Sequence, residues 1–203
     1  MPEPAPRPFK LGAIVLAAGG SSRMGTSKQL LQFRGVSLVA RATDATLLAG
    51  ANPVAVVLGA NSERVRAEVA NRPVLAPHNP DWATGVASSI RVGLAALLAA
   101  EPALDAVVVA PCDQPALSAE VIDRLADLQR STGMIAAARF GGRNGAPAVF
   151  GREHFALLSE LSGDEGARQF LNSDPGKVAF VDLPALGADI DTPADYAAWT
   201  NQP

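Results

Sequence analysis

Short apolar runs rich in β-branched residues recur along this chain and constrain its fold more than any other feature. Ala13–Ala18 and Val54–Leu58 are apolar throughout, and Leu104–Ala110 is apolar apart from Asp105. Runs without alternating polar residues are typical of strands that are buried on both faces of a sheet. Segments with helical spacing separate them, and strands that alternate with helices favour a mainly parallel sheet with helices on both faces. The sequence therefore predicts an α/β fold.

Spacing and helix-capping residues place the remaining elements. Helical spacing is expected over 29–50, with a turn at Gly35 and the main helix from about Ser37, and further helices over 62–70, 86–100, 118–131, 154–161, 164–172 and 193–200. Additional strands are expected over 73–75, 134–139, 147–150 and 178–183. Ser62, Ser118 and Thr192 are the expected N-caps of their helices. Residues 1–10 are proline-rich and are expected to form a flexible arm, with residues 11–203 forming a single domain.

Composition excludes several classes of function. The chain has 203 residues, of which 48% are hydrophobic and 18% charged, as in globular proteins. A net charge of −3 argues against non-specific nucleic-acid binding, which requires a basic surface. No apolar run approaches the roughly 20 residues of a membrane span. Cys112 is the sole cysteine, so no internal disulfide can form, and we expect a cytoplasmic protein.

A glycine-rich polar loop, Gly19–Lys28, follows the first apolar run. A buried strand that leads into such a loop commonly brings backbone N–H groups against phosphate. The loop fits neither familiar phosphate motif. A Walker A loop requires lysine directly after its second glycine, but Thr26 follows Gly25, and the G-x-G-x-x-G dinucleotide fingerprint is absent.

With both motifs excluded, the loop is characterised by two basic residues. Arg23 lies inside it and Lys28 lies about one turn later. Two cations that converge with loop amides suit a triphosphate whose leaving group is pyrophosphate. A glycine-rich turn with two solvated basic residues is an equally open interpretation of the same pattern.

Two carboxylates are candidate ligands for Mg²⁺, which prefers oxygen ligands. Asp113 directly follows the strand that ends near Ala110, where α/β enzymes bind ligands. A helix-capping role for Asp113 is disfavoured because Ser118 is better placed for that cap. Asp191 precedes an expected helix, so it either provides a second metal ligand or interacts only with the helix dipole.

A third candidate region is the irregular segment Asn79–Gly85 with the start of the helix that follows it. Gly85, Ser88 and Ser89 would allow close backbone approach and supply polar groups that read a base edge. Trp82 would either cover the base or anchor the core. Cys112 is interpreted as a small packing residue, since the sequence places no basic group beside it that would lower its pKa. The acidic, glycine-rich loop 162–166 is either a cap or a contact to a second substrate.

Five ordered segments resemble one family. They are LAAGGSSRMGTSKQLL, NPDWATGVASSIRVGL, PCDQP, LSGDEGARQFL and DIDTPADY, and together they span about Ile14 to Tyr196. They resemble the MobA-like nucleotidyltransferases, and among these the molybdenum cofactor cytidylyltransferase branch. The resemblance implies a Rossmann-like three-layer nucleotidyltransferase fold with a mainly parallel sheet.

The resemblance also implies roles for residues that match the family's motifs. Arg23, Lys28 and Asp113 would be catalytic, with Arg23 and Lys28 on the triphosphate and Mg²⁺ held by Asp113 and Asp191. The nucleotide would be bound by Leu16, Ala17, Ala18, Gly19, Arg23, Gly25, Lys28, Gly85 and Ser89. One departure concerns the family element G-x-x-G-H-P, in which Ala146 replaces the usual histidine.

The implied reaction is transfer of CMP from CTP to the molybdopterin (molybdenum) cofactor, with release of pyrophosphate and an apo-molybdoenzyme as recipient. The segment Ala17–Gly19 favours CTP, although Gly20 permits a register that is typical of guanylyltransferases. The alternatives are GTP, another small phosphorylated acceptor, an NAD(P)H-linked oxidoreductase or a non-catalytic cofactor chaperone. The missing dinucleotide fingerprint disfavours the oxidoreductase, and the intact charged residues disfavour the chaperone.

Overall fold

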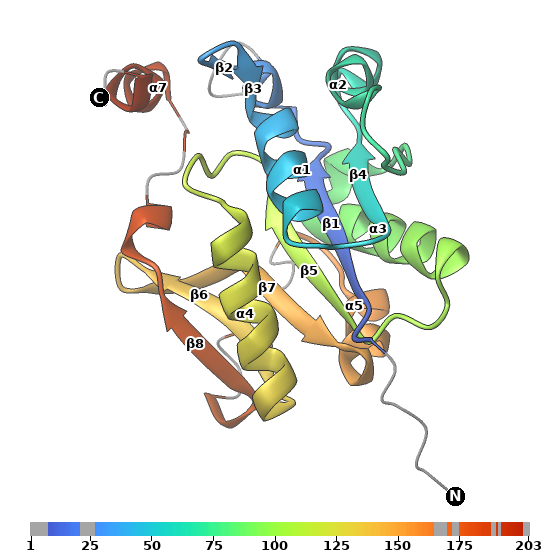
Figure 1. The fold of residues 1–203 in the computed structure, drawn as a ribbon. Coiled ribbons are helices and arrows are strands. Elements are labelled where there is room, and N and C mark those ends of the chain that lie inside the picture. The colour runs from blue at the N-terminus through green and yellow to red at the C-terminus, as the bar shows by residue number, and fades with distance from the viewer. Residues whose placement is uncertain are drawn as a thin grey trace, which may run out of the picture.

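The computed structural model describes residues 8–20, 27–164, 170–171, 175–187, 190 and 192–200 (Figure 1). Among these residues, six strands form the central sheet in the order β4-β1-β5-β7-β6-β8. The strands are β1 (Leu11–Ala17), β4 (Val54–Leu58), β5 (Ala106–Pro111), β6 (Ile135–Phe140), β7 (Arg143–Gly151) and β8 (Val178–Asp182). Strand β7 is antiparallel to its neighbours β5 and β6, and the other pairings are parallel. The predicted mainly parallel sheet is confirmed.

Helices cover both faces of this sheet, as predicted. The helices α1 (Leu38–Leu48), α2 (Ser62–Val69) and α4 (Ala119–Thr132) pack on one face, and α3 (Val86–Ala100) and α5 (Phe155–Glu160) pack on the other. Side chains of β1 alternate between the two layers: Ala13 and Val15 join the core under α1, and Ile14 joins the core under α3. A strand whose two faces are both buried needs apolar residues at every position, which explains the continuous run.

Helix α3 packs very close to the sheet. A Cβ atom at Gly93 would lie 2.6 Å from Ile14 Cγ2 and 3.0 Å from Val57 Cγ2. Distances this short leave no room for a side chain at position 93. The helix therefore approaches β1 and β4 closely at a residue that has no side chain.

Most of the expected helix starts are present. Ser118 Oγ accepts a hydrogen bond from the Val121 N–H (3.3 Å), so Ser118 is the N-cap of α4, as predicted. A capping box begins α7 (Pro193–Thr200), because Thr192 and Asp195 each accept from the other's backbone N–H. The predicted N-cap of α2 is wrong: Asn61, with φ of 57°, occupies that position, and asparagine tolerates the left-handed conformation.

The segment after Lys28 is not a helix. A 3₁₀ turn over Lys28–Leu30 leads into an antiparallel hairpin of β2 (Gln32–Phe33) and β3 (Val36–Ser37). Arg34 and Gly35 both have positive φ, at 52° and 78°, which is the conformation of a two-residue hairpin turn. The expected turn at Gly35 is therefore present, but the two short strands beside it were not predicted, because the apolar residues there have helical spacing. The main helix does begin near Ser37, as expected.

Two other elements differ from expectation. Residues 73–75 form only an isolated bridge, Ala55 with Leu75, and no strand. Strand β7 begins at Arg143, because the chain reverses at Gly141 and Gly142 and pairs again at once with β6. The helix expected over 164–172 lies mostly outside the described residues. Further 3₁₀ turns cover Trp82–Thr84, Arg152–His154, Pro175–Lys177 and Pro184–Gly187.

Helix α7 packs on the β2-β3 hairpin. The rings of Phe33 and Trp199 have centroids 4.4 Å apart, and the Tyr196 hydroxyl donates to the Gln32 carbonyl (2.6 Å). At the other end of the chain, residues 1–7 of the expected arm lie outside the described residues, whereas the Lys10 N–H donates to Asp105 (2.8 Å). Within the described ranges, no helix is both long enough and apolar enough to cross a bilayer.

Candidate functional site

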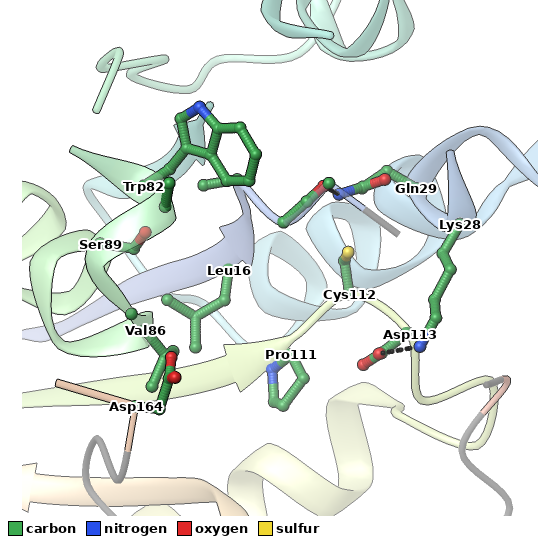
Figure 2. A pocket seen from close by; sticks show the side chains of 15 residues that line it. Leu16, Lys28, Gln29, Trp82, Val86, Ser89, Pro111, Cys112, Asp113 and Asp164 are labelled. Carbon is green, nitrogen blue, oxygen red and sulfur yellow. Dashed lines mark hydrogen bonds and ion pairs between the residues drawn. The ribbon is translucent and has the colours of Figure 1, made fainter. Parts of the chain in front are cut away.

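A cavity of about 460 Å³ opens beyond the carboxyl ends of β1 and β5 (Figure 2). Three segments far apart in the sequence surround it: the end of β1 with the loop that follows, the residues after β5, and the loop that leads into α3. The lining residues are Leu16, Ala18, Gly19, Gly20, Lys28, Gln29, Trp82, Ala83, Gly85, Val86, Ser89, Pro111, Cys112, Asp113 and Asp164.

Most of the predicted site residues that the structure describes line this cavity. Ala17 is an exception: it is not among the lining residues, and its carbonyl accepts a hydrogen bond from Gln29. Arg23, Gly25 and Asp191 lie outside the described residues. The residue before Asp191 is described: the Ile190 N–H donates to the Asp113 carbonyl (3.3 Å).

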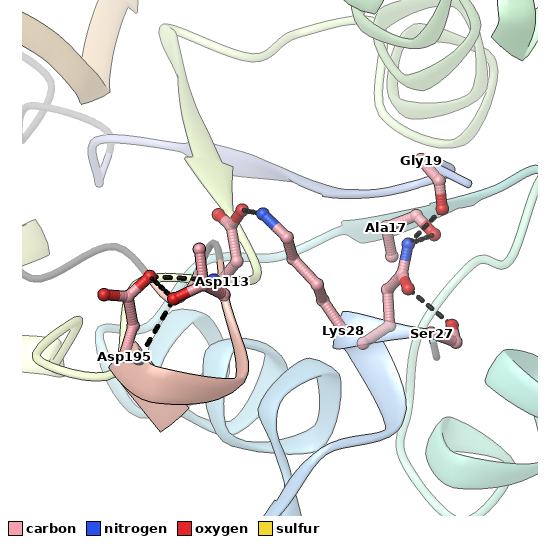
Figure 3. A network of polar contacts seen from close by, with 8 residues as sticks. Ala17, Gly19, Ser27, Lys28, Asp113 and Asp195 are labelled. Atoms are coloured by element: carbon pink, nitrogen blue, oxygen red, sulfur yellow. Dashed lines mark hydrogen bonds and ion pairs between the residues drawn. The ribbon is translucent and has the colours of Figure 1, made fainter. Parts of the chain in front are cut away.

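Lys28 and Asp113 form an ion pair at one end of the cavity (Figure 3). Lys28 Nζ lies 3.5 Å from Asp113 Oδ2, and these side chains are 15% and 32% exposed. The carboxylate is therefore accessible from the cavity, and an ammonium group lies beside it. In the described ranges no three His, Cys, Asp or Glu side chains cluster as a metal site.

Gln29 fixes the backbone at the start of the glycine-rich loop. Its buried Nε2 donates to the carbonyl oxygens of Ala17 (3.2 Å) and Gly19 (2.6 Å), and its Oε1 accepts from Ser27 Oγ (2.6 Å). Gln29 thereby joins Ala17, the last residue of β1, to Gly19 and Ser27 of the glycine-rich loop. Sequence reasoning missed Gln29, because its partners are backbone atoms that no side-chain pattern reveals.

We expect Gln29→Met to reduce the free energy of unfolding by about 1–3 kcal/mol, since two backbone carbonyls and a serine hydroxyl lose a buried partner. Urea unfolding measures this. Gln32→Met, at an exposed glutamine of the hairpin, is the matched control and should change stability little. Equal stability of the two variants would contradict the role of Gln29.

Cys112 lines the cavity with a buried side chain. Burial, followed by the charge of the neighbouring Asp113, raises the pKa of the Cys112 thiol, so the thiol is protonated at neutral pH. Its side chain belongs to the core under α1. The interpretation of Cys112 as a packing residue is confirmed.

The other end of the cavity is lined by Trp82 and the start of α3 (Figure 2). Trp82 is half-buried against the core under α3 and also approaches the loop after β1, because a Cβ atom at Gly20 would lie 3.0 Å from Trp82 Cη2. Trp82 thus contacts the core, as one of the two interpretations expected, and it also lines the cavity.

Gly85 is required where α3 begins. Its φ of 118° and ψ of 165° lie in a region that is essentially restricted to glycine. A Cβ atom there would be 2.4 Å from the backbone of Gly163, whose carbonyl accepts a hydrogen bond from the Ala87 N–H (3.2 Å). The described part of the acidic loop therefore packs on the start of α3, and this contact brings Asp164 to the cavity.

The fold and the cavity can be compared with known proteins. The sequence profile of the MobA-like NTP transferase domain matches residues 13–178. The chain belongs to the MobA-like NTP transferase family. The predicted family and its α/β nucleotidyltransferase fold are both confirmed.

Two proteins with similar sequences have names that indicate different activities. Nicotine blue oxidoreductase of Paenarthrobacter nicotinovorans is 36% identical over 191 residues, covering 88% of this chain and 91% of the relative. Molybdenum cofactor guanylyltransferase of Rhodobacter capsulatus is 31% identical over 199 residues, covering 96% of this chain and 92% of the relative.

A solved structure gives the same architecture. The crystal structure of Rv0371c from Mycobacterium tuberculosis is 29% identical and has a TM-score of 0.81, covering 97% of this chain and 100% of that chain. The crystal structure of the Rv0371c complex with manganese is 27% identical to this chain and has a TM-score of 0.77. The match covers 96% of this chain and 99% of that chain.

Proposed function

We propose that this protein transfers CMP from CTP to a pterin-type molybdenum cofactor in a reaction that requires Mg²⁺ and releases pyrophosphate. One observation carries the proposal. A single cavity has the Lys28–Asp113 pair at one end and Trp82 with Ser89 at the other, as a bound nucleoside triphosphate requires (Figure 2). Membership of an NTP transferase family supports it further.

The residues present fit a divalent cation. Asp113 offers a carboxylate that is accessible from the cavity, and Asp191 would be the second ligand. A bound Mg²⁺ would neutralise phosphate charge and align the α-phosphate with the acceptor. Manganese occurs in the Rv0371c complex, which is consistent with a divalent cation in this fold.

The protein's contribution is positioning and charge neutralisation. An oxygen of the acceptor phosphate attacks the α-phosphorus of the nucleotide in line, a new P–O bond forms, and the bond to pyrophosphate breaks. Lys28 and Arg23 would stabilise the negative charge that develops on the leaving pyrophosphate. The attacking phosphate oxygen is already ionised, so no general base is required.

The nicotine blue oxidoreductase relative raises an oxidoreductase as a second candidate. The glycine-rich loop lacks the G-x-G-x-x-G fingerprint by which many dinucleotide-binding proteins hold a pyrophosphate at a helix N-terminus. Nucleotidyl transfer therefore accounts better for the residues around the cavity.

Pyrophosphate release tests the proposal. The protein is incubated with Mg²⁺ and each of CTP, GTP, ATP and UTP, with and without molybdopterin cofactor. We expect release that depends on the cofactor and is fastest with CTP. A preference for GTP would overturn the choice of base, and no release with any triphosphate would overturn nucleotidyl transfer to this acceptor. If the protein binds NADPH without molybdopterin cofactor, and the Lys28→Ala and Asp113→Ala variants bind it equally well, the oxidoreductase is favoured instead.

A further inference from the structure

A buried amide and two serine hydroxyls form a hydrogen-bond network behind the Trp82 end of the cavity. The Asn79 side chain is only 1% exposed. Its Nδ2 donates to Ser88 Oγ (2.8 Å) and Ser89 Oγ (3.0 Å), and its Oδ1 accepts from the Asp81 N–H (3.0 Å). All the hydrogen-bonding groups of this amide except one oxygen lone pair are therefore engaged.

The direction of these bonds is fixed by the backbone. A backbone N–H can only donate, so the Asn79 atom that faces Asp81 must be the carbonyl oxygen. The amino group then faces the two serines and gives one hydrogen to each. A hydroxyl that accepts such a hydrogen bond keeps its own proton for another acceptor.

The hydroxyl protons of Ser88 and Ser89 face different acceptors. Ser88 Oγ lies 2.8 Å from the Gly85 carbonyl and 3.1 Å from the Asp81 carbonyl, so its proton is donated to the backbone of the loop that leads into α3. Ser89 lines the cavity, and in the part of the chain that the structure describes its hydroxyl accepts from Asn79 and donates to no protein group (Figure 2). Ser89 therefore presents an O–H donor to the cavity.

We infer that Asn79 is a positioning residue that sets the hydrogen-bond polarity of Ser89, and that Ser89 donates to an acceptor atom of the nucleobase. The inference rests on the proposed function, which places the base at this end of the cavity. The ligand must offer a ring nitrogen or a carbonyl oxygen at this point, as cytosine does with N3 and O2. An exocyclic amino group at the same point would face another donor and would be rejected.

Three variants separate this role from simple packing. Asn79→Asp keeps the shape and the acceptor for the Asp81 N–H, but it replaces the amino group with an oxygen that accepts. The serine protons then turn toward position 79, and Ser89 no longer donates to the cavity. Ser89→Ala removes the donor itself. Ser88→Ala is the matched control, because its hydroxyl binds the backbone and does not line the cavity.

Binding of CTP, GTP and inorganic tripolyphosphate, each with Mg²⁺, is measured by calorimetry for the wild type and for each variant. We expect Ser89→Ala and Asn79→Asp each to weaken binding of the preferred nucleotide by about fivefold to tenfold and to leave tripolyphosphate binding unchanged. The double variant should bind no more weakly than Ser89→Ala alone, because Asn79 acts through Ser89. Ser88→Ala should leave the ratio of nucleotide to tripolyphosphate affinity unchanged.

The outcomes distinguish this inference from the proposed function. A wild type that binds CTP and GTP no more tightly than tripolyphosphate would overturn both. If nucleotides are preferred but Ser89→Ala binds them as well as the wild type, or if the two substitutions add, the inference alone fails. Should Asn79→Asp unfold in thermal melts, the comparison of Ser89→Ala with Ser88→Ala decides the question, since equal losses in both would overturn it.

Discussion

Replacing Asp113 with asparagine is expected to lower kcat for pyrophosphate release roughly 10³-fold, which corresponds to about 4 kcal/mol of transition-state stabilisation. Asparagine keeps the size of the side chain but removes the negative charge that would hold a divalent cation and that pairs with Lys28 at 3.5 Å. Because the Asp113 side chain is partly exposed, the substitution should leave the fold intact.

Two measurements test the Asp113 variant. Pyrophosphate release is followed at increasing Mg²⁺, and Mn²⁺ binding is followed by electron paramagnetic resonance without nucleotide. Asp127→Asn removes a carboxylate from the exposed surface of α4 and serves as the control that should keep full activity. Unchanged turnover and unchanged Mn²⁺ binding in Asp113→Asn would eliminate Asp113 as a metal ligand.

Gly85→Ala should be the most destabilising single methyl addition near the site, at about 2–5 kcal/mol. Two costs combine: a backbone conformation that alanine rarely adopts, and a Cβ atom placed 2.4 Å from the Gly163 backbone. For a chain of this size such a loss lowers Tm by about 10 °C. Nucleotide affinity should fall as well, because Gly163 must move and the start of α3 lines the cavity.

Gly133→Ala is the matched control for this second variant. Gly133 also has a positive φ, of 68°, but nothing lies within 4 Å of a Cβ atom there. Its substitution should cost only about 1–2 kcal/mol, from the left-handed backbone alone. If both variants melt at the same temperature, the close contact between Gly85 and Gly163 does not contribute to the loss of stability.

The sequence predicted the parts of this fold that depend on local patterns. The strands β1, β4 and β5 are buried on both faces, so their apolar runs were visible without knowledge of their neighbours. The turn at Gly35 was predicted, but the pairing of β2 with β3 was missed, because each strand has only two residues and Arg34 adopts a positive φ that its residue type does not suggest. Turn geometry that departs from residue preference is visible only in the structure.

The candidate site divides in the same way. Lys28 and Asp113 were found because charged residues next to buried strands stand out, and the structure shows that their side chains meet. Gln29 and Asn79 were not assigned roles, since their importance depends on backbone atoms and hydroxyls brought together by folding. The restriction on Gly85 arises from Gly163, which belongs to a distant part of the chain.

The close contact at Gly93 has a consequence for how substrate choice can change. Gly93 lies one helical turn after Ser89, and a Cβ atom at position 93 would meet Ile14 and Val57. We therefore expect a side chain at position 93 to move α3, and Ser89 with it, away from the sheet. Under the proposed function, we expect substitutions at position 93 or at Ile14 to change selectivity for a base without contacting the ligand. Directed evolution toward another nucleotide should randomise these core positions together with the lining residues.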